Sequence, residues 1–399
     1  MHPAEDIRGI KSKKLSEKRI ILGITGSIAA IDSVKLAREL IRHGAFVFPV
    51  MSKAATRIIH PDSMEYSTAV RPIVELTGKT EHVLHCGMTE NKADLLIISP
   101  CTANTISKIA HGIDDTAVTT FATTAIGSNV PIIIVPAMHL SMYNNRVVKE
   151  NIKKLKKIGI KFIDPLITGN VAKIPTYADI TEIVLRTIGP QDLKSIKLLV
   201  IGGATSEDID DVRSITNRSS GKTAIAIANN AFERGADIEL WYGCSAEQVP
   251  NYIPVKKFCN IQDLFNLVDK NELEFDIIII CAAISDYLPL KHKGKISSNK
   301  EKLTIELYPT KKVIKNIKSK FPKTKIIGFK LEEKKNELRQ KTYSLLKEND
   351  LDFVVGNTIY ALGKDESEVC IVDKKGKVNQ KKGNKEQIAS YILDVINMD

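Results

Sequence analysis

Short runs of almost entirely apolar residues recur along this chain, and a segment with helical character follows most of them. Three of the clearest lie in the first half: RIILGIT (19–25), DLLIISP (94–100) and PIIIVPAM (131–138). Strands that are apolar on both faces are typical of a parallel sheet covered by helices on each side. The alternation of such strands with helices over about 180 residues therefore predicts a doubly wound α/β domain.

The pattern breaks around GPQDLKSIK (189–197) and then starts again with KLLVIGGAT (197–205). A helix is expected over about 220–234, followed by the strand ADIELWYG (236–243). Further along, FDIIIICAA, KIIGFK and DFVVGN have the character of strands, and KDESEVCIVDKKGKV (364–378) that of a hairpin. The second half therefore has the pattern of a second α/β domain.

The two halves also resemble each other locally, since IRHGAFVFPVMS (41–52) has a counterpart in FERGADIELWYG (232–243). We predict two doubly wound, Rossmann-like domains of the α/β class. The expected boundaries are a mobile N-terminal arm 1–18, a first domain 19–188, a linker 189–196 and a second domain 197–399.

Length and composition limit the class of protein. At 399 residues the chain is long enough for two domains, each with its own core. Its longest apolar runs, such as 277–284, are far shorter than the roughly 20 residues that a membrane span requires. No secretory signal pattern opens the sequence, and the six cysteines form no CxxC pair, so neither zinc nor a disulfide framework is indicated. We expect a soluble cytoplasmic protein with no membrane partner.

The formal net charge of +11 suggests a partner that carries negative charge. Lysine-rich stretches such as 153–157 and 311–325 can attract nucleic acid or phosphorylated metabolites. No basic run is interleaved with aromatic residues, however, and a solvated lysine-rich surface is the simpler interpretation. We expect no nucleic-acid binding at physiological salt; tight, steeply salt-dependent binding to unrelated DNA or RNA would favour that alternative.

The stretch NRSSGKT (217–223) resembles the end of a phosphate-binding P-loop. A P-loop needs a second glycine five residues before Gly221, and that position is Thr216. The chain is therefore not expected to be a P-loop nucleotidase. Gly221 is instead expected to open a helix N-terminus, where unpaired N–H groups bind an anion, with Lys222 at its mouth.

Polar residues follow the predicted strands of the first domain. GITGSIAA (23–30) contains small residues where a strand meets a helix, and SPCTANTISKIAHGIDDTAVTT (99–120) is dense in hydroxyl and amide groups. VPAMHLSMYNN (135–145) adds Met, His and Asn at another strand end. Ligands of open α/β sheets bind at the carboxyl ends of the strands, so these three segments predict a binding site.

In this order, GITGSIAA, SPCTANTISKIAHGIDD and PAMHLSMY resemble the motifs of the flavin-containing cysteine decarboxylases. Within that group the first domain is similar to phosphopantothenoylcysteine decarboxylase over about residues 19–185. The resemblance implies that FMN binds against Gly26, Ser27, Ser52, Thr102, Asn104 and Thr105. It also implies a catalytic histidine before the strand DLLIISP, for which His82 is the first choice and His85 the alternative.

The first domain departs from the family pattern at two places. The substrate clamp usually has Asn after Met138, whereas this chain has His139, whose imidazole can still donate a hydrogen bond to a carboxylate. Many members also have a cysteine proton donor in a flap after the clamp. The corresponding stretch LITGNVAKIPTYAD (166–179) has no cysteine, and the resemblance identifies no acid in its place.

The second domain resembles phosphopantothenate–cysteine ligase over about residues 197–395. The resemblance rests on NRSSGKTA, CAAISDYLP, GKISSNKEKLTIEL, IIGFKLE and DFVVGNTI. It implies catalytic roles for Arg213, Asn217 and Lys295 around an acyl-nucleotide intermediate. The substrate-binding residues would be Ser219, Ser220, Gly221 and Lys222, and the nucleotide-binding residues Ala283, Asp286, Lys295, Lys311, Lys312, Val313, Ile314, Phe329 and Lys347. Mg²⁺ or Mn²⁺ is expected with the triphosphate, and CTP is the expected nucleotide, with ATP as the alternative.

Together the two resemblances imply successive steps of coenzyme A biosynthesis. The ligase joins 4'-phosphopantothenate to cysteine, and the decarboxylase converts the resulting 4'-phosphopantothenoylcysteine to 4'-phosphopantetheine. The alternative is a ligase whose first domain is a non-catalytic, flavin-binding regulator, which the missing flap cysteine would favour. The family further implies a homo-oligomer built from trimers and dimers, up to a dodecamer.

Overall fold

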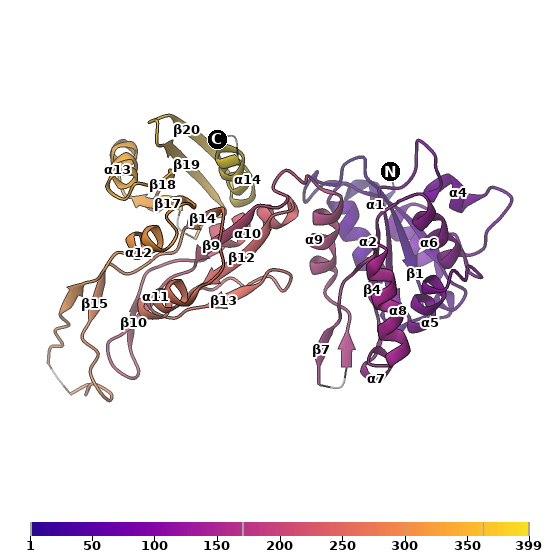
Figure 1. Ribbon diagram of the computed structural model, residues 1–399, viewed down its shortest axis with the longest axis horizontal. Coiled ribbons are helices and arrows are strands. Elements are labelled where there is room, and N and C mark those ends of the chain that lie inside the picture. The colour runs from indigo at the N-terminus through magenta and orange to yellow at the C-terminus, as the bar shows by residue number, and fades with distance from the viewer. Residues whose placement is uncertain (1, 170, 300, 362, 398–399) are drawn as a thin grey trace. The chain divides into compact units, whose positions relative to one another are not determined.

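The computed structural model describes residues 2–169, 171–299, 301–361 and 363–397. The chain divides into two compact units, Met1–Gly189 and Pro190–Asp399 (Figure 1). Both units are α/β, as the sequence predicts. Within the described ranges, no helix is both long and apolar enough to cross a membrane.

The first unit is built on a five-stranded parallel sheet with the order β2-β1-β3-β4-β6. Its central strands coincide with the apolar runs of the sequence, and every residue of β3 and β4 is buried. The predicted parallel sheet is therefore confirmed. The strands are β1 Arg19–Ile24, β2 Phe46–Met51, β3 Leu95–Cys101, β4 Ile132–Pro136 and β6 Lys161–Phe162.

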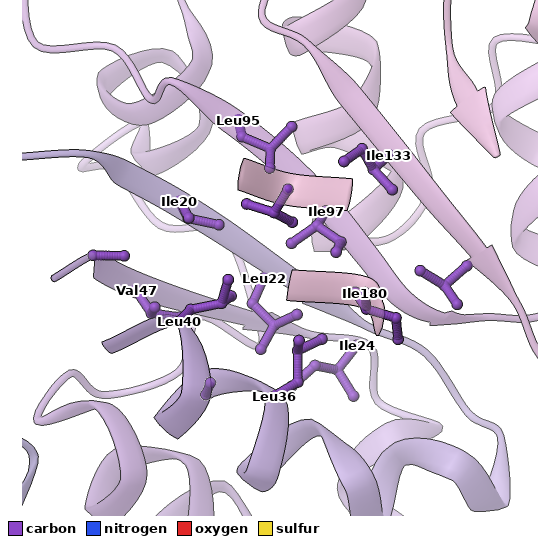
Figure 2. Close-up of a cluster of buried hydrophobic side chains, with 14 of the residues drawn as sticks. Ile20, Leu22, Ile24, Leu36, Leu40, Val47, Leu95, Ile97, Ile133 and Ile180 are labelled. Atoms are coloured by element: carbon purple, nitrogen blue, oxygen red, sulfur yellow. The ribbon is translucent and has the colours of Figure 1, made fainter. Parts of the chain in front are cut away.

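Helices cover both faces of this sheet because successive side chains of a strand point to opposite sides. On one face Ile20, Leu22 and Ile24 pack with α2 (Ser33–Arg42) and α9 (Tyr177–Ile188), as Figure 2 shows. On the other face Ile21 packs with α5 (Ala103–Ala110), α6 (Ala117–Gly127) and α8 (Arg146–Lys157). The remaining elements are α1 Pro3–Asp6, η1 Ile28–Asp32, η2 Ala55–Arg57, α3 Pro61–Thr68, α4 Glu81–Cys86, α7 Leu140–Tyr143 and a small sheet of β5 Met138–His139, β8 Val171–Lys173 and β7 Leu166–Thr168.

Residues 2–18 are an ordered part of the first unit, so the expectation of a mobile arm is wrong. Leu15 is fully buried in the core beside α2. The backbone N–H groups of Gly9, Lys11, Ser12 and Leu15 donate to carbonyl groups of residues 41–43, at the end of α2. The last carbonyls of a helix have no partner within the helix. The segment therefore caps α2, a function that its polar composition does not reveal.

The second unit is built on an eight-stranded sheet with the order β13-β12-β9-β14-β17-β18-β19-β20. The first six strands are parallel, and β19 and β20 continue the sheet as the predicted antiparallel hairpin. The strands are β9 Lys197–Gly202, β12 Asp237–Tyr242, β13 Val255–Lys257, β14 Ile277–Ile280, β17 Lys325–Glu332, β18 Phe353–Thr358, β19 Glu366–Asp373 and β20 Val378–Asn384.

Helices flank this second sheet as well. Leu199, Ile201 and Ile278 share a core with residues of α11 (Ile261–Lys270), α12 (Val313–Lys320) and α13 (Lys335–Glu348). Two further helices, α10 (Lys222–Glu233) and α14 (Lys385–Asn397), pack against each other and against the sheet. The unit is completed by the pairs β10 Ser206–Asp208 with β11 Ser214–Thr216 and β15 Tyr287–Pro289 with β16 Leu307–Pro309, and by η3 Ile359–Ala361.

The segment predicted as a linker, 189–196, packs on the second unit from residue 190 onward. Leu193 is buried, and its N–H donates to the carbonyl of Arg234. Asp192 forms an ion pair with the Arg234 guanidinium. These contacts make residues 190–196 a part of the second unit rather than a linker.

Candidate active sites

The strand order places one ligand site in each unit. In the first sheet the chain leaves β1 to form β2 on one side and then returns to form β3 on the other. In the second sheet the same reversal occurs between β9 and β14. Open α/β sheets bind ligands at the carboxyl ends of the strands beside such a switch point. A cavity opens at each of these two positions.

The first cavity has a volume of about 760 Å³. Five of the six residues predicted to contact flavin line it: Gly26, Ser52, Thr102, Asn104 and Thr105. A Cβ at position 26 would lie 2.6 Å from the Cβ of Ala54, so the backbone after β1 approaches the loop after β2 too closely for another residue. Ser27, the sixth, is next to the lining residue Gly26 in the sequence and is the N-cap residue of η1.

Threonine hydroxyls hold the loops of the first cavity together. The Thr25 hydroxyl donates to the carbonyl of Pro100 at 2.9 Å and accepts from the Thr102 N–H at 3.0 Å, which links the ends of β1 and β3. Thr102 caps α5, and Thr116 caps α6 through a reciprocal pair with Thr119. Two helix N-termini therefore border the cavity, and such ends favour a negatively charged ligand group.

The first cavity also contains charged residues for which the sequence motifs predict no role. Lys53 forms an ion pair with Glu75 at 2.6 Å, and Lys108 forms one with Asp115 at 2.7 Å. The remaining lining residues with no predicted role include Asp114, Thr116, Thr120 and Met142. Asp114 to Thr120 lie inside the motif SPCTANTISKIAHGIDDTAVTT. Their position in this motif is the sequence feature that could have identified them as cavity residues.

The two candidate histidines lie on α4, and neither belongs to the described lining of the first cavity. The His85 ring packs 4.9 Å from the Phe48 ring and 6.3 Å from the Phe121 ring, measured between centroids. Burial lowers the pKa of His85, and the charge of Arg19 lowers it further. His85 therefore has the environment of a packed, neutral side chain.

The predicted clamp residues follow β4. Met138 is half-buried against the core under α5 and α6, whereas His139 is exposed. Both belong to β5, whose backbone pairs with β8. Neither lines the first cavity as described, but Met142, one helical turn further along, does.

The second cavity has a volume of about 480 Å³ and lies at the ends of β9, β14, β17 and β18. Seven predicted residues line it: Asn217, Ser219, Ser220, Gly221, Ala283, Asp286 and Phe329. Gly221 has a φ of 77° and is the N-cap of α10, as predicted for an anion site. A Cβ there would lie 1.9 Å from the Tyr242 hydroxyl oxygen, so only glycine fits. The amide nitrogen of Asn217 donates to the carbonyl of Ala283 at 3.2 Å, which joins two sides of the cavity.

Asp210 brings together two of the predicted catalytic residues of the second unit. Its buried carboxylate accepts from the N–H groups of Ile296, Val212 and Arg213 and from the Arg213 guanidinium. These hydrogen bonds, the one from Ile296 first, hold the pKa of Asp210 well below its ordinary value. Arg213 also donates to the carbonyl of Ile296 at 3.1 Å, so the neighbouring, exposed Lys295 is held near Arg213. Neither Arg213 nor Lys295 lines the described cavity.

Several predicted nucleotide residues lie beside the second cavity rather than in it. Lys312 is the N-cap residue of α12, and its ammonium group forms an ion pair with Asp286 at 2.5 Å. Val313 is buried in the core, Ile314 packs against that core, and Lys311 is exposed. For these residues the backbone at the start of α12 is the part available to a ligand.

Lys347 is in the wrong place, and this expectation is corrected. It lies in the last turn of α13, where its ammonium group is 5.3 Å from the Tyr343 ring centroid. Because α13 runs from the end of β17 back to the start of β18, its last turn is at the sheet edge opposite the cavity. Three polar residues that do line the cavity had no predicted role: Lys330, Asn357 and Lys385.

Lys222 is next to the lining residue Gly221, and its ammonium group pairs with Asp365 at 2.6 Å. In the part of the chain that the structure describes, no group of three or more His, Cys, Asp or Glu side chains is arranged to hold a metal ion.

These observations define a class of protein with two α/β units, each with a ligand cavity at the carboxyl ends of its parallel strands. Residues 8–189 match the family described as Flavoprotein, and residues 193–398 match the C-terminal domain of the DNA/pantothenate metabolism flavoproteins. The chain belongs to the family of the coenzyme A biosynthesis bifunctional proteins named CoaBC. It is 43% identical to the member from Thermococcus kodakarensis, over 99% of both chains. It is 36% identical to the member from Methanocaldococcus jannaschii, over 99% of this chain and 97% of the relative.

Among solved structures, the DNA/pantothenate metabolism flavoprotein of Streptococcus pneumoniae aligns with 51% of this chain and 99% of its own, with 27% identity and a TM-score of 0.46.

Proposed function

We propose that the first cavity binds FMN and decarboxylates 4'-phosphopantothenoylcysteine, and that the second joins 4'-phosphopantothenate to cysteine using CTP and Mg²⁺ (or Mn²⁺). Family membership makes the chain a bifunctional enzyme of coenzyme A biosynthesis with decarboxylase and ligase activities. A regulatory, non-catalytic first domain is not favoured, because the match to bifunctional relatives covers the full chain. The observation that carries the assignment is that the first cavity contains five of the six residues predicted to contact flavin, and the second contains seven of the fifteen residues predicted for the ligase reaction.

The residues of the first cavity fit a flavin mononucleotide. The close approach at Gly26 makes a narrow cradle, and Ser52, Thr102 and Thr105 supply hydroxyl groups around it. The N-terminus of α5 suits a single phosphate group. When bound, FMN supplies the redox chemistry that allows the cysteine carboxylate to leave as CO₂. His139, which is exposed on β5, would donate a hydrogen bond to that carboxylate.

We assign the catalytic proton transfer to His82 rather than His85, because His85 is packed between two aromatic rings. Since α4 is not part of the described lining of its own cavity, His82 would act at the cavity of a second copy of the chain. The exposed apolar residues Val83, Leu84 and Met88, on and after α4, fit a subunit contact. This arrangement supports the expected trimer of first units.

In the second cavity, Ala283, Asp286 and Phe329 would hold the nucleotide, while the start of α12 and Lys312 approach its phosphates. Asn217 would contact the acyl group of the intermediate. Arg213 and Lys295, both held through Asp210, would stabilise negative charge as that intermediate forms and collapses.

A Mg²⁺ ion would be held mainly by triphosphate oxygens and water, as is usual for this ion. The exposed apolar side chains Tyr287, Leu290, Leu307 and Tyr308, around β15 and β16, fit the expected pairing of second units. We further propose that the enzyme works in the cytoplasm and does not bind nucleic acid.

The test is to incubate the purified chain with phosphopantothenate, cysteine, Mg²⁺ and either CTP or ATP, and to follow the products by mass spectrometry. We expect phosphopantothenoylcysteine, then phosphopantetheine, with CTP as the better nucleotide and a flavin absorbance in the protein. Failure of both nucleotides to yield an amide would overturn the ligase assignment. Bound flavin without CO₂ release from supplied phosphopantothenoylcysteine would overturn the decarboxylase assignment.

A further inference from the structure

Two exposed cysteines lie close together in the second unit. All six cysteines of the chain are in the described ranges and are free thiols, and two of them are exposed, Cys244 and Cys259. A thiol has to be accessible before it can react with a molecule in solution. These two residues are therefore the candidates for chemistry at sulfur.

The strands that carry the two cysteines are neighbours. β12 and β13 run parallel, Tyr242 is paired with Lys257, and each cysteine follows the end of its strand by two residues. The Cys244 sulfur lies 3.9 Å from the carbonyl oxygen of Cys259. The Cβ atoms of a disulfide are about 3.8 Å apart and neighbouring strands about 4.8 Å apart, so rotation of the two side chains and a backbone shift of about 1 Å allow the bond.

One segment of backbone is hydrogen-bonded to both cysteines. The N–H of Ala204 donates to the carbonyl of Cys244 at 2.9 Å, and the N–H of Cys244 donates to the carbonyl of Ala204 at 2.8 Å. Two residues further along, the N–H of Ser206 donates to the carbonyl of Cys259 at 2.8 Å. If the two cysteines move toward each other, the segment 204–206 has to move with them.

The same segment continues into the wall of the second cavity. Gly203 lines that cavity, and its carbonyl accepts from the N–H of Ala283, another lining residue, at 2.8 Å. The packing behind the wall is close: a Cβ at Gly243, the residue before Cys244, would lie 2.4 Å from the carbonyl oxygen of Ala204. A bond between the cysteines would therefore displace the cavity wall.

The two thiols are not equivalent. Partial burial raises the pKa of Cys244, and the neighbouring Cys259 and the charge of Glu207 raise it further. The thiolate is the species that attacks a disulfide, so a thiol whose ionisation is disfavoured is the poorer first nucleophile. This difference assigns the first attack to Cys259 and the second to Cys244.

We propose that Cys259 and Cys244 form a reversible disulfide that lowers the ligase activity, with a low-molecular-weight disulfide RSSR as the oxidant. The Cys259 thiolate attacks one sulfur of RSSR, which gives a mixed disulfide on Cys259 and releases one RS⁻. The Cys244 thiolate then attacks the Cys259 sulfur, which closes the protein disulfide and releases the second RS⁻. The protein loses two electrons and two protons, and RSSR is reduced to two thiols RSH.

The bond itself does not depend on the proposed ligase function, whereas its effect on activity rests on that function. Disulfides of proteins in reducing compartments are usually transient and respond to the redox state. The proposed ligase reaction consumes cysteine, which is oxidised under the same conditions as other small thiols. A pair that reacts with small disulfides therefore links the rate of amide formation to the supply of reduced cysteine.

The first measurement follows the bond. The full chain is reduced, freed of reductant and incubated with bis(2-hydroxyethyl) disulfide, and mass spectrometry identifies the products. We expect the wild type to lose two hydrogens and to give a peptide cross-linked through Cys244 and Cys259. Cys244→Ser should stop at the mixed disulfide on Cys259, and Cys259→Ser should stay unmodified at both positions. A wild type that forms no cross-link, or that stops at the mixed disulfide, would overturn the proposal.

The second measurement follows activity as the burst of pyrophosphate from phosphopantothenate and CTP, without cysteine, because free cysteine reduces the bond. We expect oxidation to slow the burst of the wild type by about tenfold and dithiothreitol to restore it. Both serine variants should keep the wild-type burst before and after treatment, which controls for reaction of the reagent elsewhere. An equal loss in Cys244→Ser, or an unchanged burst in the cross-linked wild type, would overturn the effect of the bond. No pyrophosphate in either redox state would overturn the ligase function, and with it the effect on activity, while the cross-link would stand.

Discussion

The two cavities occupy the same place in related sheets, yet their charges differ. The lining of the first contains two lysines, Lys53 and Lys108, and three acidic residues, Glu75, Asp114 and Asp115. The lining of the second contains three basic residues, Arg218, Lys330 and Lys385, and one acidic residue, Asp286. The strand order thus determines where a ligand binds, whereas the residues after each strand determine which ligand it is.

The difference agrees with the two proposed reactions. In the first cavity both lysines are paired with carboxylates of the same lining, which leaves hydroxyl groups and helix ends to bind one phosphate. In the proposed ligase reaction the second cavity would hold a triphosphate and a phosphorylated acid together, and its excess of basic residues would offset their charge. The comparison can be tested by changing one cavity while both reactions are measured.

A large effect is expected for Gly221→Ala in the second cavity. The new Cβ would lie 1.9 Å from the Tyr242 hydroxyl oxygen, so the start of α10 must move. We expect kcat/KM for amide formation to fall by at least about 100-fold, because displacements near 1 Å have that effect. Gly376→Ala is the matched control: its φ of 81° is similar, but the nearest side-chain atom is 3.7 Å away. Equal losses in the two variants would show that backbone strain, not the clash, is responsible.

His82→Gln should lower decarboxylation by about 100- to 10,000-fold, which is the usual contribution of acid–base catalysis. Amide formation should be unchanged, because His82 belongs to the first unit. The measurement is CO₂ release from supplied phosphopantothenoylcysteine, beside amide formation in the same preparation. If decarboxylation stays near the wild-type rate, the assignment moves to His85.

Gly26→Ala changes the first cavity at its narrowest point. The added Cβ would lie 2.6 Å from the Ala54 Cβ, so the loops after β1 and β2 must separate. We expect FMN affinity to fall by about tenfold, or roughly 1.4 kcal/mol, measured by equilibrium dialysis. The control is Gly127→Ala in the same unit, where an added Cβ has no neighbour within 4 Å. Unchanged flavin affinity in Gly26→Ala would remove this cavity as the FMN site.

Asp210→Asn tests how Arg213 and Lys295 are positioned. Losing the negative charge weakens the bonds from Ile296 and Arg213, and we expect the ligase kcat to fall by about tenfold. Because the pKa of Asp210 is lowered in the folded state, its contribution to stability is present above about pH 4 and is lost as the pH falls below that.

The corresponding measurement is the urea midpoint of the wild type and of Asp210→Asn between pH 7 and pH 3. We expect the difference in urea midpoint between the wild type and Asp210→Asn to be constant above pH 5 and to shrink below about pH 4. A difference in urea midpoint that does not change with pH would show that the charge of the Asp210 carboxylate does not contribute to the stability of the folded state.

The smallest effect concerns His85, whose pKa is lowered in the folded protein. The unfolded chain binds a proton below about pH 6.5, the ordinary pKa of histidine, while the packed ring does not. Stability contributed by His85 is therefore present above that pH and is lost as the pH falls toward the folded pKa. We expect His85→Phe to flatten the decline in unfolding midpoint between pH 7 and pH 5, and replacement of the exposed His292 by Gln to leave it unchanged.

The strands and the location of both cavities could be predicted from the sequence because they depend on local patterns. Buried parallel strands require runs such as 94–100, and small residues such as Gly26 and Gly221 are required where two segments approach closely. The similar turns before β2 and β12 also follow from local sequence, since Gly44 and Gly235 end the preceding helices with positive φ.

The remaining features depend on contacts between distant segments. Residues 2–18 have a polar sequence, and only the open carbonyls at the end of α2 show why they are ordered. Lys347 is the lysine nearest before the strand DFVVGN, and this position in the sequence does not show that α13 carries it away from the cavity. Lys330 lies within the motif IIGFKLE, but Lys385 is one among 58 lysine and arginine residues, and no local pattern distinguishes it before the sheet is assembled.

The most direct test of two separate active sites is the product formed by His82→Gln from phosphopantothenate, cysteine and CTP. If each cavity carries one reaction, mass spectrometry should show phosphopantothenoylcysteine accumulating at the wild-type rate with almost no phosphopantetheine. Loss of amide formation in this folded variant would contradict the division of the two reactions between the two units.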